Sequence, residues 1–201
     1  MAASSESFAN HLVLHDVSWE SYTRLLEALG DRRLRHAYDR GTLEMMSPSE
    51  KHESLKRFIG RLIETASLEC GMSIRSVGSA TQRRKALGQG LEPDESYYIA
   101  PAGRRKSAPP DLVVEIDLGR TQIDRLESYG QLGVREVWRY CKGAVEFFER
   151  DADGQMAPVA RSAAFSMLAS KDITRFVRKL RGANENELIL EFMAWLRKRM
   201  T

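Results

Sequence analysis

Three acidic side chains, Asp94, Asp111 and Glu115, lie within or beside two short apolar runs in the middle of the chain. The runs are Tyr97–Ile99 and Leu112–Val114, and the prolines and charged residues around them are typical of the ends of short strands. Side chains of a strand alternate between its two faces, so Asp111 and Glu115 are predicted to share one face. Carboxylates gathered on a buried sheet repel one another unless a cation or a proton offsets their charge.

An all-oxygen site of this kind favours Mg²⁺ or Mn²⁺ over Zn²⁺ as the bound ion. A purely structural interpretation is also open from the residues alone. Asp94 could cap a turn, Asp111 could stand at the entry to a strand, and Glu115 could pair with an arginine. Glu115 lies inside an apolar strand, so a solvent-exposed surface charge explains it least well.

The composition is that of an ordinary globular protein, with 201 residues, 42% hydrophobic residues, 29% charged residues and a net charge of +3. We expect one domain over 1–201, with a core at about 34–160, an N-terminal arm at 1–17 and a helical tail at 170–201. The sequence has no long apolar run, so no contact with a membrane is expected. Cys70 and Cys141 lack the spacing of a metal site or a disulfide framework, which indicates a reducing cytoplasm.

The elements that must position the acidic residues can be predicted from periodicity and capping residues. Before the acidic strands we expect a helix over Trp19–Leu29 and a hairpin of Leu34–Tyr38 and Thr42–Met46. A second helix is expected to have Ser47 as its N-cap and Pro48 as its first residue, and to stop at Gly71. A strand over Ser73–Ala80 and a basic loop over Thr81–Leu91 follow. After them we expect a helix over Thr121–Leu132, a strand over Val134–Tyr140, a hairpin of Val145–Arg150 and Met156–Val159, and helices over Lys171–Leu180 and Glu185–Met200. This order predicts an α/β (α+β) fold in which helices flank a small mixed sheet.

Further polar residues are candidates for the same site. Glu44 lies in the second strand of the first hairpin, and His52 lies in the first turn of the next helix, although a single histidine there is more often structural. Two basic triplets, Arg83-Arg84-Lys85 and Arg104-Arg105-Lys106, flank the acidic stretch. They would suit a phosphate backbone beside a metal site, but each could also be a solvated group of loop charges.

The order and spacing of several segments resemble the Uma-two family of restriction-endonuclease-like proteins, within the PD-(D/E)XK nuclease superfamily. The resemblance runs from about Leu14 to Leu196 and rests on these segments: VSWESY, YDRGTLEMMSPSEKHE at 38–53, EPDESYYI at 92–99, PPDLVVEI at 109–116 and DRLESYGQLGVREVWRY at 124–140. It implies a restriction-endonuclease-like core with the order α-β-β-β-α-β. It also implies a DNA substrate and Mg²⁺ or Mn²⁺ as the cofactor.

The resemblance assigns roles to most of the candidates. Asp94 is similar to the first acidic motif residue, Glu115 is similar to the acid of the (D/E)XK motif with Asp111 beside it, and Glu44 and His52 match an acid and a histidine around the first core helix. The lysine expected two residues after that acid is replaced by Asp117.

In the Uma-two family the lysine comes instead from the following helix, four residues before a tyrosine. Counting back from Tyr129 leads to Arg125. Arginine binds phosphate through a planar fork but is a poor base, so the exchange is not conservative.

Two functions therefore remain open. The first is a Mg²⁺-dependent endonuclease that hydrolyses phosphodiester bonds of DNA. The second is a weak or inactive nuclease fold that binds nucleic acid or oligomerises. A homodimer would allow both strands of a duplex to be cut. The last helix carries Leu188, Phe192, Trp195 and Leu196 on one face, which could form a dimer interface or could pack on the chain's own sheet.

Overall fold

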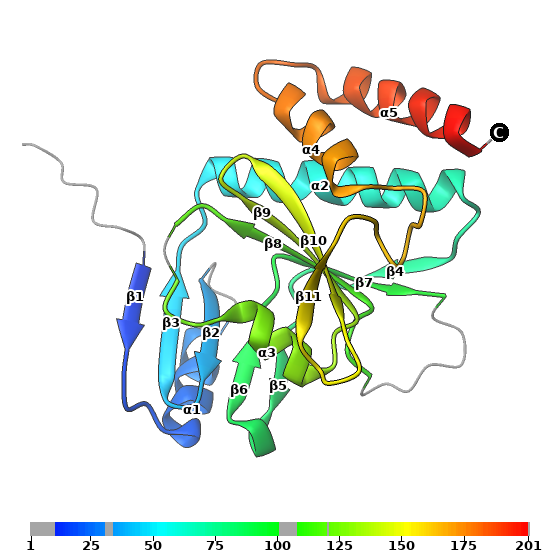
Figure 1. Cartoon of the computed structure of the whole chain (residues 1–201). Helices are drawn as coiled ribbons and strands as arrows, with labels where there is room; N and C mark the ends of the chain where they lie inside the picture. Colours follow the sequence, from blue (N-terminus) through cyan, green and yellow to red (C-terminus); the bar gives the residue numbers. More distant parts are fainter. Residues whose placement is uncertain (1–10, 31–33, 101–107, 120, 201) are drawn as a thin grey trace, which may run out of the picture.

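The computed structural model describes residues 11–30, 34–100, 108–119 and 121–200, and it places their strands in two sheets (Figure 1). The six-stranded sheet has the order β11-β10-β9-β8-β7-β4. Strands β8 and β9 are parallel and the other neighbours are antiparallel, so this sheet is mixed, as predicted. Its strands are β4 (Ile74–Ser76), β7 (Glu95–Ile99), β8 (Leu112–Asp117), β9 (Glu136–Cys141), β10 (Ala144–Arg150) and β11 (Met156–Val159).

The second, five-stranded sheet is antiparallel and has the order β1-β3-β2-β6-β5. Its strands are β1 (His11–Leu14), β2 (Arg35–Asp39), β3 (Thr42–Met46), β5 (Gln82–Arg84) and β6 (Gln89–Leu91). The predicted basic loop over Thr81–Leu91 is therefore wrong, because it folds as β5, the short 3₁₀ helix η1 (Lys85–Leu87) and β6. Pairing of β6 with β2 buries three residues that have no alternating pattern of their own.

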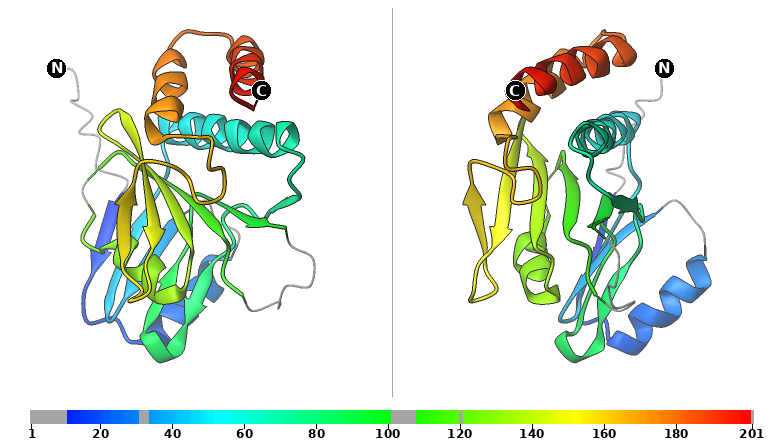
Figure 2. Two further views of the ribbon diagram at one scale, coloured as in Figure 1. Left: turned by 45° about the vertical axis from the view of Figure 1, so that its right-hand side comes forward. Right: turned by 90° about the vertical axis from the view of Figure 1, so that its right-hand side faces the viewer.

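Helices cover both faces of the six-stranded sheet (Figure 2). Helices α2 (Glu50–Glu69) and α4 (Ser170–Lys179) pack on one face, and α5 (Glu185–Met200) packs on α2 and α4. Helix α3 (Arg125–Leu132) contacts β5, β6 and β11, which places it between the two sheets. The series α2, β4, β7, β8, α3 and β9 confirms the predicted α-β-β-β-α-β order, with β5 and β6 inserted.

The start of α2 differs from the prediction. The N-cap is Ser49, whose hydroxyl accepts a hydrogen bond from the backbone N–H of His52 at 3.2 Å, and the helix begins at Glu50. Ser47 and Pro48 precede the helix, so the predicted cap at Ser47 is wrong. Both serines are suitable caps, and the path of the chain leaving β3 decides between them.

Side chains of β8 alternate between two hydrophobic cores, one on each face of the six-stranded sheet. Leu112, Val114 and Ile116 are buried among side chains of α2, α4 and α5, whereas Val113 is buried with residues of α3 and the second sheet. Glu115 has the same parity as Val113 and therefore faces α3.

The apolar face of α5 is used inside the chain. Leu188, Phe192 and Leu196 are buried in the cluster that α2 and α4 also form. The dimer-face alternative for these residues is therefore wrong, and the helix packs on other helices instead of directly on the sheet. No described helix is both long and apolar enough to cross a membrane.

Candidate active site

Asp94 and Glu115 meet at the end of β8. Glu95 of β7 pairs with Val114 of β8, so the antiparallel register places Asp94 next to Glu115. The carboxylate of Asp94 accepts a hydrogen bond from the backbone N–H of Ile116 at 2.8 Å. The two residues are only 3% and 5% exposed, so the structure brings two carboxylates together in a buried position.

Glu115 is held by two side chains of α3. Its Oε2 lies 3.0 Å from Nη1 of Arg125, and its Oε1 accepts a hydrogen bond from the hydroxyl of Tyr129. Burial raises the pKa of Glu115 to about 7, and the charge of Asp94 adds to this effect, although Arg125 and Tyr129 oppose it. Burial, more than the neighbouring charges, therefore disfavours the ionised form of Glu115.

His52 and Arg35 contact the other carboxylate. Nε2 of His52 lies 3.1 Å from Oδ2 of Asp94, and Nε of Arg35 lies 3.8 Å from Oδ1. His52 reaches this position because the Ser49 cap fixes the first turn of α2 beside the end of β7. His52 thus orients Asp94, and it is 2% exposed.

Glu44 has a different place from the one predicted. It is buried in β3, and its Oε1 accepts hydrogen bonds from the backbone N–H groups of Gln122 and Ile123, the latter at 3.3 Å. These residues precede α3, so Glu44 anchors the start of the helix that carries Arg125. Glu44 does not line the pocket described next, although it lies directly behind one wall.

A pocket of about 750 Å³ opens onto this group. We call it the Asp94–Glu115 pocket. Its walls come from the link between β3 and α2, from the ends of β7 and β8, and from the start of α3. The charged or titratable side chains among its lining residues are His11, His52, Asp94, Glu115, Asp117, Asp124, Arg125 and Arg139.

Asp111 is not part of this group. It precedes β8, and its Oδ2 accepts a hydrogen bond from the backbone N–H of Ile99 at 2.8 Å. It has the same strand parity as Glu115, but four residues of extended chain separate the two by about 13 Å. The structure therefore corrects the prediction of Asp111 as a third ligand, because residues on one face of a strand can still lie at its opposite ends.

The first basic triplet does not form one patch. The guanidinium of Arg84 donates to the carbonyl oxygens of Gln131 and Leu132, and Lys85 forms an ion pair with Glu20 at 3.0 Å. Arg83 points into a separate pocket, because neighbouring side chains on β5 alternate. The second triplet, Arg104, Arg105 and Lys106, lies outside the described residues.

The residues at the site fit a divalent cation of the Mg²⁺ type. In the described part of the chain, no three His, Cys, Asp or Glu side chains are arranged to hold a metal. Mg²⁺ nevertheless commonly binds through one or two carboxylates, with waters and substrate phosphates as its other ligands. Asp94 and Glu115 provide that pair, because the two carboxylates come from neighbouring strands and both line the pocket.

Sequence reasoning missed three residues of the site. The first is Tyr129, which lies four residues after Arg125 on the same face of α3, so that both side chains reach Glu115. Arg35 and Arg139 come from strands whose registers bring them to the site. Nothing in their local sequence signals this placement.

Comparison with protein families agrees with the geometry. The model of the Uma2 family, described as "Putative restriction endonuclease", matches residues 19–180. The chain belongs to the Uma2 family. This confirms the resemblance to the Uma-two family noted in the sequence.

A solved structure gives the same result for the fold of this Uma2 chain. It is the crystal structure of a putative nuclease belonging to DUF820 from Anabaena variabilis ATCC 29413. Its comparison with this chain gives a TM-score of 0.56 and a sequence identity of 14%. The match covers 76% of this chain and 96% of that chain. The fold is therefore the restriction-endonuclease-like α+β fold. No curated protein matches this chain significantly.

Proposed function

We propose that this chain is a metal-dependent endonuclease that hydrolyses phosphodiester bonds of DNA in the Asp94–Glu115 pocket. The observation that carries the proposal is the pair of buried carboxylates, drawn from neighbouring strands, with Arg125 beside them at an open pocket. Two desolvated carboxylates cost stability, so a cation-binding role explains their pairing. Membership in the Uma2 family supports the nuclease assignment.

Asp94 and Glu115 would hold the ion, and their neighbours fix them in place. The backbone N–H of Ile116 and the ring of His52 orient Asp94, while Tyr129 orients Glu115. A bound Mg²⁺ or Mn²⁺ ion supplies Lewis-acid polarisation of the phosphate and makes a nearby water more acidic.

Arg125 balances negative charge at the site. Its side chain is 13% exposed and lines the pocket. Burial lowers the pKa of its guanidinium, but the charge of Glu115 outweighs this effect and raises it, so Arg125 stays positively charged. A guanidinium can bind two phosphate oxygens at once and stabilise the charge that develops during hydrolysis. Because it stays protonated, Arg125 acts through its charge and not as a base.

Cleavage of labelled duplex DNA tests this proposal with a matched pair of substitutions. Asp94→Asn should lower Mg²⁺- or Mn²⁺-dependent cleavage by at least about a hundredfold, the scale of losing one preorganised stabilising group. Asp111→Asn makes the same chemical change outside the pocket and should leave cleavage unchanged. If Asp94→Asn cleaves as fast as the wild type, the site assignment is wrong.

A second function, DNA binding without cleavage, is favoured by one observation. Both carboxylate oxygens of Glu115 are already engaged, one by Arg125 and one by Tyr129. Arg125 would then be a permanent counter-ion in place of a metal. This alternative predicts salt-sensitive DNA binding and no cleavage with any divalent ion, so the same cleavage assay separates the two functions.

A further inference from the structure

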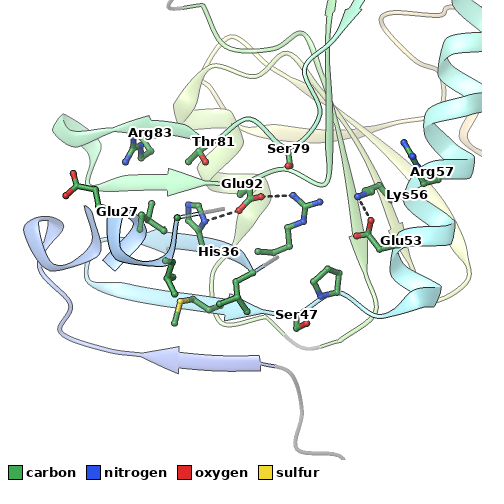
Figure 3. A pocket seen from close by; sticks show the side chains of 17 residues that line it. Glu27, His36, Ser47, Glu53, Lys56, Arg57, Ser79, Thr81, Arg83 and Glu92 are labelled. Carbon is green, nitrogen blue, oxygen red and sulfur yellow. Dashed lines mark hydrogen bonds and ion pairs between the residues drawn. The ribbon is translucent and has the colours of Figure 1, made fainter. Parts of the chain in front are cut away.

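Figure 3 shows a second pocket, of about 1000 Å³. We call it the Arg57–Arg83 pocket. It is enclosed by α1, the β2–β3 hairpin, the start of α2 and the segment 79–83. Ser47 lines both pockets, and Arg35 lines this one while its Nε lies 3.8 Å from Asp94. A ligand in this pocket would therefore lie next to the proposed reaction site.

The carboxylates inside the pocket are mostly used by neighbouring side chains. Glu92 lies 2.6 Å from Nη1 of Arg35 and 3.0 Å from Nδ1 of His36, and Glu53 pairs with Lys56. Burial raises the pKa of Glu92, but His36 and Arg35 outweigh it and the net shift is downward, so Glu92 stays ionised. Its charge is thus balanced within the protein.

Two arginines are left to face solvent at separate places on the rim. Arg57 comes from α2 and Arg83 comes from β5, and among the described residues neither has an ion-pair partner (Figure 3). Glu27 is the one lining carboxylate for which the described residues show no ion pair, so unpaired cations outnumber unpaired carboxylates on the lining. The rim consequently attracts an extended anion that can reach from Arg83 to Arg57.

The lining of the pocket is partly apolar. Leu26, Leu29 and Met45 are half-buried there, and Ser79 and Thr81 add hydroxyl groups. A cationic rim with an apolar wall suits single-stranded nucleic acid, whose backbone contacts cations while its unstacked bases pack on side chains. In a duplex the faces of the bases are stacked on one another inside the helix, so they cannot pack on apolar side chains of the protein.

One buried ring nitrogen gives a further contact for a base. His36 is 5% exposed, and its Nδ1 lies 3.0 Å from Oε2 of Glu92. The other nitrogen, Nε2, has no hydrogen-bond partner within the described residues. An imidazole nitrogen accepts or donates a hydrogen bond according to its protonation, and the edge of a base offers both kinds of group.

We propose that the Arg57–Arg83 pocket binds unpaired nucleotides of the substrate strand next to the scissile phosphate. The identity of the adjoining site rests on the proposed nuclease function. The substrate class is therefore DNA with a single-stranded segment, such as an overhang, a flap or a fully unpaired strand.

Fluorescence anisotropy without divalent ions tests the proposal, with a labelled single strand, its duplex and a duplex with an overhang as probes. The variant Arg57→Gln/Arg83→Gln should bind the single strand and the overhang at least about tenfold more weakly, and bind the blunt duplex with little change. The plot of the logarithm of the binding constant against the logarithm of the salt concentration has a negative slope. For the single strand, the magnitude of this slope should decrease by about 1.4, because two phosphate contacts are removed. The control Arg135→Gln/Lys171→Gln removes two cations that line neither pocket and should bind all probes as the wild type does.

Three results would overturn the proposal: equal weakening in both double variants, equal weakening for blunt duplex and single strand, or no weakening at all. Cleavage of the same probes by the wild type and Asp94→Asn separates this proposal from the proposed function. If binding follows the prediction but no probe is cut, the nuclease function fails and the single-strand pocket is supported. If cleavage depends on Asp94 but the Arg57→Gln/Arg83→Gln variant binds the single strand as the wild type does, only the assignment of the Arg57–Arg83 pocket fails.

Discussion

At the residue scale, Glu115 is the side chain on which the site depends. It lies inside an apolar strand, and burial together with Asp94 raises its pKa to about 7 despite the guanidinium beside it. A residue that only stabilised the fold could be replaced by an apolar one at little cost. The unfavourable environment of Glu115 is therefore a sign of function.

The raised pKa of Glu115 predicts a pH-dependent stability for the metal-free protein. The folded-state pKa is above the unfolded value, so the folded state loses stability as pH rises from about 4.5 to about 7. Glu115→Gln does not titrate, so the free energy of unfolding of the wild type should fall relative to this variant over that range. The expected loss is at most about 3.5 kcal/mol, from about 1.4 kcal/mol for each pH unit between about 4.5 and about 7. Urea unfolding in EDTA measures it, and a difference that rises with pH would contradict the environment assigned to Glu115.

Arg125 should act through its positive charge. Arg125→Lys keeps a cation near Glu115 and should retain metal-dependent cleavage within about tenfold, whereas Arg125→Met removes it and should lose about a hundredfold or more. Single-turnover cleavage with saturating protein measures both. Equal loss in the two variants would mean that the planar fork, and not the charge, is required.

At the scale of elements, short-range patterns could be predicted and long-range contacts could not. The bounds of α1 and α5 follow from local periodicity and caps, and both helices lie at the predicted residues. The strands β5 and β6 have three residues each and form through pairing with β2, so no local pattern announces them. The alternation of side chains along a strand predicts the face on which Asp111 lies, but it does not predict the distance of Asp111 from Glu115.

The start of α2 gives a test of this distinction. Ser49→Ala removes the oxygen that accepts from His52 N–H and should cost about 1 kcal/mol of unfolding free energy. Ser47→Ala is the matched control, since Ser47 precedes the helix, and should cost less than about 0.5 kcal/mol. Denaturant unfolding compares the two, and a larger effect at Ser47 would place the cap there after all.

Glu44 connects the second sheet to the start of α3. Glu44→Leu leaves the N–H groups of Gln122 and Ile123 without their acceptor and should cost about 1–3 kcal/mol of stability. Cleavage should fall with it, because the start of α3 positions Arg125. Glu44→Gln keeps an acceptor oxygen and should recover most of both properties. Wild-type cleavage in Glu44→Leu would show that this anchor is unnecessary.

At the scale of the whole molecule, the second sheet is part of the site. It supplies Glu44 behind one wall and Arg35 next to Asp94, and it forms much of the Arg57–Arg83 pocket. The sequence predicted the nuclease core through the family resemblance and the order of its elements. It could not predict that the inserted strands and the first hairpin form one sheet, because that pairing joins segments about 50 residues apart.

Calorimetric titration of Mn²⁺ tests the central claim most directly. It compares the wild type, Glu115→Gln and Asp111→Asn, each alone and with a short oligonucleotide that resists hydrolysis. The account predicts that the wild type and Asp111→Asn bind Mn²⁺, and that Glu115→Gln binds at least about tenfold more weakly because one of two carboxylate ligands is lost. Equal binding by all three proteins, or no binding by the wild type even with the oligonucleotide, would contradict a metal site at Asp94 and Glu115.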